Sequence, residues 1–359
     1  MPSPPPRSSR EPASPLGAGD HDDDDGFFEA HDITVDPDLS DSTDSVAGDD
    51  GRPESTTSLT ASLFDYRKIH GRTYQNSQTT EYWAPIDEEQ AEGLDITHHF
   101  MTLLFDDKLS LAPIGDNPQH VLDVGTGTGI WAIDFADEFP SASVVGFDIS
   151  PIQPAWVPPN LRFEIDDAQL PWTYPADHFD FVHLRNLHGG ISDWPSLYSE
   201  AFRCTQPGGY IEHVEFNIRT LSDIAPPDHI YNRWNALFAE AGERMGRTFQ
   251  IYDQMRGYIE DAGYTDVVSR TWKVPIGGWA KDPRLKSIGL YTLLFLDQSV
   301  EGFALYMLKN VMGWEFEEIQ VLIAQMKEGW KQWKRWQPYY EIKLVYAKKP
   351  ERSMPISSH

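Results

Sequence analysis

The sequence predicts an α/β protein built on a doubly wound, mostly parallel β-sheet, and three observations predict it. Short apolar runs of strand length, residues 120–124, 144–147 and 161–165, alternate with polar and helical segments. The first run leads directly into a glycine-rich loop, Gly-Thr-Gly-Thr-Gly at 125–129. The second run delivers an acidic residue, Asp148, at its carboxyl end. Strands that alternate with helices in this way form a parallel sheet with helices on both faces.

Residues 119–150 are the centre of this prediction. After the glycine loop, Pro140 ends a helix whose apolar face is predicted from four residues at helical spacing: Ala132, Phe135, Ala136 and Phe139. In a doubly wound sheet, ligands bind beyond the carboxyl ends of the strands, where a loop without side chains lets the backbone approach them. Asp148 is then placed to accept hydrogen bonds from ribose hydroxyls. The alternative is an ordinary tight turn that binds nothing.

The spacing of the loop narrows the choice of nucleotide. A dinucleotide fingerprint needs G-x-G-x-x-G/A, whereas this loop is G-x-G-x-G and has Ile130 at the last position of that pattern. No Gly-Lys-Ser/Thr follows the loop, which excludes a P-loop. Asp123, two residues before the first glycine, would repel a pyrophosphate but can receive an ammonium group. S-adenosylmethionine, which carries an amino acid and a sulfonium and no phosphate, therefore suits this loop better than NAD.

The remaining elements are predicted from hydrophobic periodicity and capping residues. Asp87 is expected to cap a helix with Glu88 and Glu89 in its first turn. Further strands are expected at 179–184, 210–214, 265–274 and 339–348, and further helices at 196–205, 228–245, 252–262, 285–312 and 315–336.

The motifs together resemble those of a known family. Asp-Val-Gly-Thr-Gly-Thr-Gly, with an acid after the second strand, is similar to the first two motifs of the class I S-adenosylmethionine-dependent methyltransferases. The whole of residues 125–154, with the later LPW, H-x-R, DW, PGGYIE and PIGGW, resembles the fungal LaeA-like methyltransferases. The resemblance runs from about Tyr66 to Pro350. It implies a Rossmann-like class I methyltransferase sheet with helical additions, and a last strand that lies antiparallel at the sheet edge beside the last-but-one strand.

The resemblance also implies which residues bind the cofactor. An acid after the third strand would take the adenine amino group while a neighbouring backbone N–H addresses the ring, and Asp167 with Ala168 is favoured over Asp166. A Gly-Arg-x-Tyr element is expected to fold over the pocket, where Arg72 would pair with the cofactor carboxylate; packing of this element onto the core is the alternative. The implied cofactor-binding set is Asp123, Gly125, Thr126, Gly127, Gly129, Asp148, Asp167, Ala168, Arg185 and Arg72.

Residues after the fourth strand face both the methyl donor and the acceptor. Arg185 is expected either to contact the cofactor or to order this loop, and His188 is the candidate general base. Glu212, His213 and Glu215 come near the end of the fifth strand, where alternation lets only some of them face the acceptor pocket. No metal site is expected, because His98 and His99 are adjacent and point to different faces of a helix.

The charge distribution separates an N-terminal tail from the rest of the chain. The net charge is −27, and residues 1–60 hold 15 acidic against 3 basic residues. We expect 1–58 to be a disordered acidic tail, either for interaction and regulation or for solubility alone. Next would come an N-terminal helical segment over the cofactor pocket (59–115), a methyltransferase domain (116–350) with a helical insertion at about 284–336, and a flexible C-terminus (351–359). Binding of nucleic acid by so acidic a chain is not expected.

Other features bear on localisation. One cysteine, Cys204, excludes an internal disulfide framework and is typical of a reducing compartment. Neither a secretory signal nor an apolar segment long enough to span a membrane is evident, so we expect a cytoplasmic and possibly nuclear protein that is not secreted.

Three functions remain open from the sequence. The first is an S-adenosylmethionine-dependent methyltransferase that acts on a small metabolite or a protein, linked to fungal secondary metabolism or developmental regulation. The second is a regulatory subunit of the same fold that works through partners, since LaeA-like proteins are associated with velvet-type regulatory complexes. The third is an NAD(P)-dependent oxidoreductase, which the Ile130 position disfavours.

Overall fold

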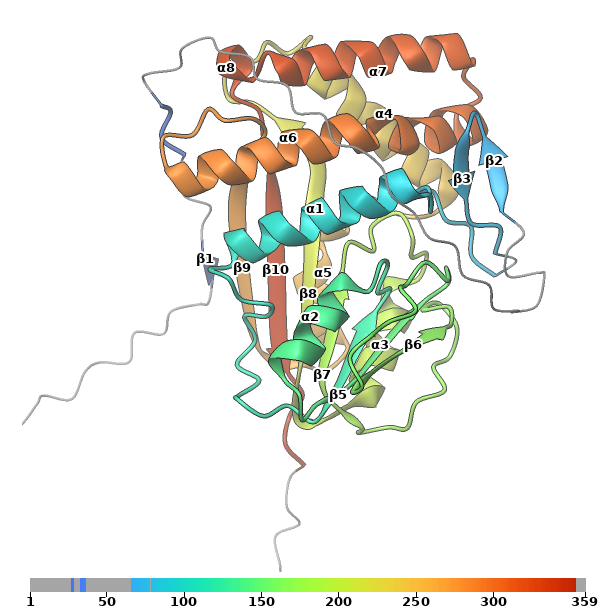
Figure 1. Cartoon of the computed structure of the whole chain (residues 1–359), viewed down its shortest axis with the longest axis vertical. Helices are drawn as coiled ribbons and strands as arrows, with labels where there is room; N and C mark the ends of the chain where they lie inside the picture. The colour runs from blue at the N-terminus through green and yellow to red at the C-terminus, as the bar shows by residue number, and fades with distance from the viewer. Residues whose placement is uncertain (1–26, 29–32, 37–65, 78, 353–359) are drawn as a thin grey trace, which may run out of the picture.

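A single twisted sheet organises the chain (Figure 1). The computed structural model describes residues 27–28, 33–36, 66–77 and 79–352. In this part of the chain the strand order is β1-β9-β10-β8-β7-β4-β5-β6. The strands are β1 (Phe27–Phe28), β4 (His120–Val124), β5 (Ser143–Asp148), β6 (Leu161–Ile165), β7 (Phe179–Arg185), β8 (Thr205–Leu221), β9 (Thr265–Pro275) and β10 (Tyr339–Lys348).

The predicted fold class is confirmed. Strands β4 to β8 pair in parallel, and the last strand, β10, runs antiparallel to both of its neighbours. The expected position of β10 at the sheet edge is wrong, because β10 lies between β8 and β9. The reason is visible in its side chains: Ile342, Leu344 and Val345 have no exposed surface, as expected of an interior strand.

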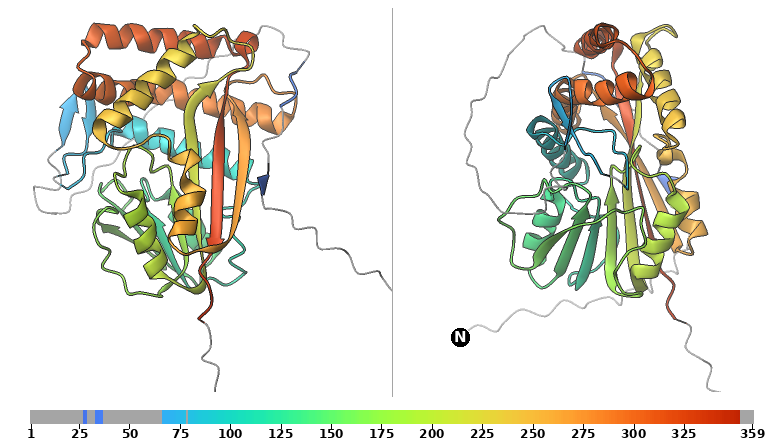
Figure 2. Two further views of the ribbon diagram at one scale, coloured as in Figure 1. Left: turned by 180° about the vertical axis from the view of Figure 1, so that it is seen from behind. Right: turned by 90° about the vertical axis from the view of Figure 1, so that its right-hand side faces the viewer.

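Helices cover both faces of the sheet (Figures 1 and 2). Helices α1, α2 and α6 lie on one face, and α3, α4 and α5 lie on the other; α7 extends beyond the end of the long strands. The helices are α1 (Glu88–Leu104), α2 (Ile130–Glu138), α3 (Trp194–Cys204), α4 (Ile230–Met245), η2 (Ile251–Asp253), α5 (Met255–Asp261), α6 (Pro283–Ala304), the π-helix η3 (Leu305–Val311), α7 (Phe316–Lys331) and α8 (Trp333–Trp336).

The apolar stripe of α2 packs where its periodicity predicts. In α2, Ala132, Phe135 and Ala136 are buried against β4 and β5. Helix α3 packs on the opposite face and carries Cys204, which is fully buried. Burial raises the pKa of the Cys204 thiol to about 11.

A short hairpin precedes the first long helix. Strands β2 (Arg67–Ile69) and β3 (Arg72–Tyr74) are joined by His70 and Gly71, which have positive φ angles of 46° and 91°. Two such residues between antiparallel strands match the mirror-image turns that two-residue hairpins favour. The segment 59–115, expected to be helical, thus contains a hairpin and one helix in its described part.

The residues between this hairpin and α1 cross the molecule as an extended segment, which we call the strap (residues 75–86, with 78 outside the described residues). It is tied at several points. Gln75 Nε2 donates to the carbonyl of Ile149 at 2.6 Å, and Trp83 Nε1 donates to the carbonyl of His188 at 3.1 Å. The strap therefore lies against two loops at the carboxyl edge of the sheet.

Most of the acidic tail, and residues 353–359 of the expected flexible C-terminus, lie outside the described residues. The pieces of the tail that are described contact the body of the protein. Strand β1 pairs in parallel with β9, Val35 bridges Ala280, and Asp36 accepts a 2.6 Å bond from Lys286. In the described part of the chain, the helices are too short or too polar for a bilayer crossing.

The hairpin is fixed to α1 by a buried ion pair. Arg72 donates from Nε and Nη2 to the two oxygens of Asp87, at 2.8 and 2.7 Å. Asp87 also caps α1, as expected, by accepting from the backbone N–H of Gln90. Burial alone would raise the pKa of Asp87, but the hydrogen bonds from Arg72 and Thr73 outweigh burial and lower it.

We predict that Asp87→Ala lowers the free energy of unfolding by about 3 kcal/mol, because it removes a helix cap and leaves the buried Arg72 guanidinium with only the 3.5 Å contact to the exposed Glu89. Urea unfolding at pH 7.5 measures the effect. The control is Glu240→Ala, which breaks an exposed pair with Arg244 and should change the free energy of unfolding by less than about 0.5 kcal/mol. Equal effects of the two substitutions would contradict the role given to Asp87.

Candidate functional site

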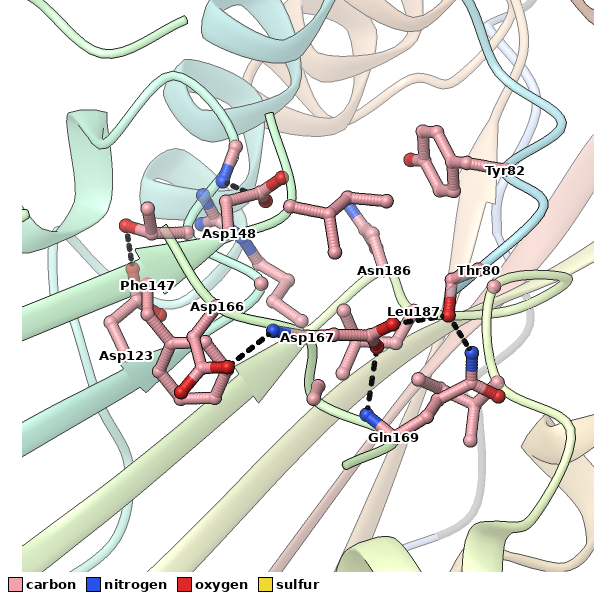
Figure 3. A pocket seen from close by; sticks show the side chains of 18 of the residues that line it. Thr80, Tyr82, Asp123, Phe147, Asp148, Asp166, Asp167, Gln169, Asn186 and Leu187 are labelled. Carbon is pink, nitrogen blue, oxygen red and sulfur yellow. Dashed lines mark hydrogen bonds between the residues drawn. The ribbon is translucent and has the colours of Figure 1, made fainter. Parts of the chain in front are cut away.

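A cavity opens at the carboxyl ends of β4, β5, β6 and β7, where ligands bind in doubly wound folds (Figure 3). It encloses about 900 Å³ of empty space, part of it at the open mouth. Its lining includes four carboxylates, and Arg185 is the only Arg or Lys among the described residues that line it. We call it the acidic cavity, after Asp123, Asp148, Asp166 and Asp167.

The three loop glycines serve different purposes. All have positive φ, 67° at Gly125, 59° at Gly127 and 80° at Gly129. A Cβ at Gly129 would lie 2.2 Å from the Phe163 ring, so this glycine lets the loop pack on the sheet. A Cβ at Gly127 would meet no protein atom closer than 3.5 Å, and Gly127 lines the cavity. The space beside Gly127 is therefore open to a ligand.

Asp148 at the end of β5 holds the glycine loop through hydrogen bonds. Its two oxygens accept backbone N–H groups of Gly127 and Ser150, each at 2.9 Å. Burial raises the pKa of Asp148 to about 6, and the charge of Asp123 adds to this; the two N–H donors oppose it. The carboxylate keeps lone pairs that face the cavity and are free for hydroxyl donors.

Asp123 lies deeper and is held from two sides. Oδ1 bonds with His183 Nδ1 at 2.7 Å, and Oδ2 accepts from the Thr126 hydroxyl at 2.6 Å. Burial lowers the pKa of His183 to about 4, so the neutral ring donates its Nδ1 hydrogen to Asp123. The ring stacks on Trp131 with centroids 3.7 Å apart. Asp123 is therefore held in place by two donors, and its predicted contact with an ammonium group stays a prediction.

Asp167 is hydrogen-bonded to the strap. Its Oδ2 accepts from the Thr80 hydroxyl at 2.6 Å, and its Oδ1 accepts from the backbone N–H of Gln169 at 3.0 Å (Figure 3). Thr80 in turn accepts from Gln169 Nε2. Ala168 lines the cavity beside Asp167, as does the more exposed Asp166. The pair Asp167 and Ala168, predicted to address a base, thus lies in the cavity, with the strap threonine bonded to its carboxylate.

Arg185 ends β7 and is held by a chain of side chains. Its Nη1 is 3.1 Å from His98 Nδ1, and His98 Nε2 is 2.9 Å from Asp134. Burial and the Arg185 charge lower the pKa of His98, so a neutral ring accepts from Arg185 and donates to Asp134. His98 is thus a positioning residue for the cavity's cation. Among the described residues no cluster of His, Cys, Asp and Glu could hold a metal ion.

A second cavity adjoins the first, and Tyr82, Leu94 and Asn186 line both. It encloses about 880 Å³ of empty space, part of it at its mouth. Its walls are mainly aromatic, and we call it the aromatic cavity: Trp83, Phe216, Trp234, Phe238, Phe249, Phe295, Phe303 and Trp330 line it. His188 belongs to this cavity and does not line the acidic one.

A buried polar chain orients His188. Its Nδ1 lies 2.8 Å from Glu215 Oε2, and Glu215 Oε1 accepts from the backbone N–H of Leu187 and from His213. The Tyr198 hydroxyl bonds with His213 Nδ1 at 2.6 Å. Burial would raise the pKa of Glu215, but the hydrogen bonds from His188 and His213 outweigh it and hold the pKa well below its usual range. Glu215 thus fixes the tautomer that leaves His188 Nε2 for the cavity.

One residue of the implied cofactor-binding set lies elsewhere, and two residues at the end of β8 line neither cavity, in keeping with the expectation that only some of them would face the acceptor. Arg72 does not line the acidic cavity, because its guanidinium is bound to Asp87, as packing of the hairpin requires. Glu212 turns away and accepts from the backbone N–H groups of Leu111 and Ala112, both at 2.7 Å. His213 lies behind Glu215 instead of lining a cavity.

The strap residues were missed by motif reasoning. Thr80 and Tyr82 approach the acidic cavity from the side opposite Asp123 and Asp148, with the Tyr82 ring facing the space between them (Figure 3). Burial raises the pKa of Tyr82, and the nearby charges of Asp148 and Glu215 add to this, so its hydroxyl stays protonated. The run Glu81-Tyr82-Trp83 was the available signal, but nothing in its spacing specifies the loops that it contacts.

Comparisons with known proteins agree with this geometry. A family model described as a methyltransferase domain matches residues 96–269. The chain is 37% identical over 277 residues to methyltransferase pytC of Aspergillus terreus, covering 76% of this chain and 85% of the relative. It is 36% identical to secondary metabolism regulator LAE1 of Cochliobolus heterostrophus (68% and 82% covered) and 31% identical to protein-methionine methyltransferase laeA of Emericella nidulans (80% and 77%).

Solved structures include more distant likenesses. Phosphoethanolamine N-methyltransferase 2 of Haemonchus contortus, in complex with S-adenosyl-L-methionine, matches with a TM-score of 0.43 and 18% identity over 72% of this chain and 52% of that one. The [4+2]-cyclase SpnF matches with a TM-score of 0.44 and 14% identity over 76% of this chain and 97% of that one.

Proposed function

Because this chain belongs to the LaeA-like methyltransferase family of fungi, we propose that it transfers the methyl group of S-adenosylmethionine to an acceptor held in the aromatic cavity. The observation that carries the proposal is the pairing of two adjoining cavities of opposite character. One is lined by four carboxylates at the carboxyl edge of the sheet, and the other is aromatic and contains an oriented histidine.

The charges of the acidic cavity fit this cofactor. S-adenosylmethionine carries an ammonium, a sulfonium and one carboxylate, so it has a net positive charge at neutral pH. Four carboxylates and one guanidinium attract such a molecule and repel the pyrophosphate of a dinucleotide. The carboxylates of this cavity therefore disfavour an NAD(P)-dependent oxidoreductase.

Each part of the cofactor has a partner among the lining residues. Asp148 would accept the ribose hydroxyls, and Asp167 with the backbone of Ala168 would address the adenine. Asp123 and the glycine loop would receive the amino acid end, where Arg185 is the cation for its carboxylate. Bound S-adenosylmethionine supplies an activated methyl group, and its sulfur leaves as neutral S-adenosylhomocysteine when the acceptor forms the new bond.

The protein's own part is positioning and proton removal. Tyr82 and Asn186 line both cavities, so they mark where donor and acceptor meet. His188, with Nδ1 held by Glu215, would take the proton of a hydroxyl acceptor at Nε2. The strap excludes water from the junction because Thr80 and Trp83 tie it to both sides.

A second function, regulation through partner proteins of the velvet type, is favoured by one observation. Relatives at 31 to 36% identity are named secondary metabolism regulators. Both functions share cofactor binding, and methyl transfer by the purified chain separates them. We propose that the methyl transfer serves fungal secondary metabolism or its developmental control.

We predict that Gly127→Val abolishes binding of S-adenosylhomocysteine, because a branched side chain would enter the space beside the loop. Calorimetric titration of the purified full chain measures this. Gly246→Val is the matched control, since Gly246 has a similar φ of 66°, has no atoms near its Cβ position and lies outside both cavities. Its backbone strain is the same but its affinity should equal wild type. Binding to a folded Gly127→Val protein would refute the proposed cofactor site.

We predict that affinity for S-adenosylhomocysteine falls about tenfold from pH 7.5 to pH 5. The pKa of Asp148 is raised to about 6, so the carboxylate is ionised at pH 7.5 and becomes protonated as the pH falls through that value. Protonation removes acceptor capacity for the ribose hydroxyls. Asp148→Asn should bind roughly 10 to 100-fold more weakly at pH 7.5 and show little change with pH. A wild-type affinity that stays constant over this range would exclude Asp148 from the site.

A further inference from the structure

We propose that the aromatic cavity takes a neutral, planar-ring small molecule that is methylated on a hydroxyl and carries a second polar group at a distance from it. This inference rests on the proposed function and specifies its acceptor. It is carried by three properties of the cavity: the shape of its walls, the absence of formal charge from its described lining, and buried polar atoms that have no partner inside the protein.

The walls favour flat rings. Ten aromatic side chains line the cavity, from the strap, β8, α4, the segment between α4 and η2, α6, α7 and β10. The other described lining residues are half aliphatic and half polar. Aromatic side chains stack on or meet the edges of planar rings with favourable geometry.

The lining favours a neutral acceptor. Among the described residues that line the aromatic cavity there is no Asp, Glu, Lys or Arg. A carboxylate or ammonium group on the acceptor would lose its hydration without gaining a charged partner, which is costly. The charged side chains line the acidic cavity instead, which shares Tyr82, Leu94 and Asn186 with the aromatic cavity.

Four side chains in the wall have a polar atom that lacks a partner within the protein: Gln90, Asn186, Trp330 and Tyr340. Gln90 and Trp330 lie away from the reacting end. Gln90 Oε1 on α1 and Trp330 Nε1 on α7 are buried and make no hydrogen bond, and both residues line the cavity. Gln90 is 4% exposed and Trp330 is 2% exposed. Buried polar atoms are nearly always satisfied, so an acceptor and a donor left open on the same cavity wall indicate ligand polar groups that complete them.

His188 defines the end of the aromatic cavity at which the acceptor would react. His188 Nε2 is available beside Asn186, which lines both cavities. The acceptor's O–H bond breaks as its proton moves to His188 Nε2, the new O–CH₃ bond forms as the donor's S–CH₃ bond breaks, and Glu215 balances the imidazolium charge. The second polar group of the acceptor then lies toward Gln90 and Trp330.

The test uses 2,6-dihydroxynaphthalene as probe, with 2-naphthol (no second polar group) and 6-hydroxy-2-naphthoic acid (a carboxylate instead) as matched compounds. Calorimetry in saturating S-adenosylhomocysteine gives affinity, and transfer from methyl-labelled S-adenosylmethionine gives turnover. We predict that the diol binds at least tenfold more tightly than the acid and is methylated on oxygen. A methionine-containing peptide, tested in parallel, should not be methylated.

Two variants test the orientation. Gln90→Leu and Trp330→Phe should each weaken binding of the diol about fivefold while leaving 2-naphthol within twofold, because only the diol has a group for them. Gln298→Leu, which loses bonds to Glu89 and Glu92 outside the cavity, is the control and should change neither. Equal effects on diol and naphthol, or tighter binding of the acid, would overturn the acceptor class.

We also predict that His188→Asn lowers kcat for the diol by 100-fold or more and leaves the affinities for diol and S-adenosylhomocysteine within about threefold. Asparagine keeps a donor for Glu215 but has no base. An unchanged kcat would remove His188 from proton transfer. Failure of wild type to bind S-adenosylhomocysteine would overturn the proposed function, and this inference with it; binding of S-adenosylhomocysteine with transfer only to the peptide or the acid would overturn the inference alone.

Discussion

The structure depends on keeping several carboxylates close together at the carboxyl edge of one sheet. Buried carboxylates are stable only when hydrogen bonds satisfy them, and here each is satisfied from a different part of the chain. Backbone N–H groups of the glycine loop and of Ser150 hold Asp148, His183 and Thr126 hold Asp123, and the strap supplies Thr80 to Asp167. The glycine loop, β7 and the strap therefore meet at this edge of the sheet, where each supplies hydrogen-bond donors to a buried carboxylate.

The same arrangement separates two kinds of chemistry. The acidic cavity is built by residues that immediately follow parallel strands, so its position is dictated by topology. The aromatic cavity is built by helices that lie outside the strand-helix repeat, with β8 and β10 as its floor. The polar chain from Tyr198 on α3 runs through His213 and Glu215 of β8 to His188 in the aromatic cavity. The proposed cofactor site and the proposed acceptor site are thus carried by different elements.

The sequence predicted well what depends on local pattern. The strands at 120–124, 161–165 and 339–348 have the predicted bounds, because each is a short apolar run between turn residues. The glycine loop and the acids at strand ends were recognised for the same reason. The sequence left open whether Arg72 binds the cofactor or packs the hairpin, because its pairing with Asp87 depends on a contact across 15 positions. The full lining of the aromatic cavity could not be assembled from the sequence, since it spans Tyr82 to Tyr340 and no local spacing records that convergence.

The burial of Cys204 has a practical consequence. Its thiol is fully enclosed on α3 and its pKa is raised to about 11, so reagents that attack thiolates at neutral pH will not reach it in the folded protein. It is the only cysteine in the chain. A cysteine introduced at Thr79, an exposed strap position, would therefore be the single reactive site for a fluorescent or spin label. A label at this position would report whether the strap moves when ligands enter and leave.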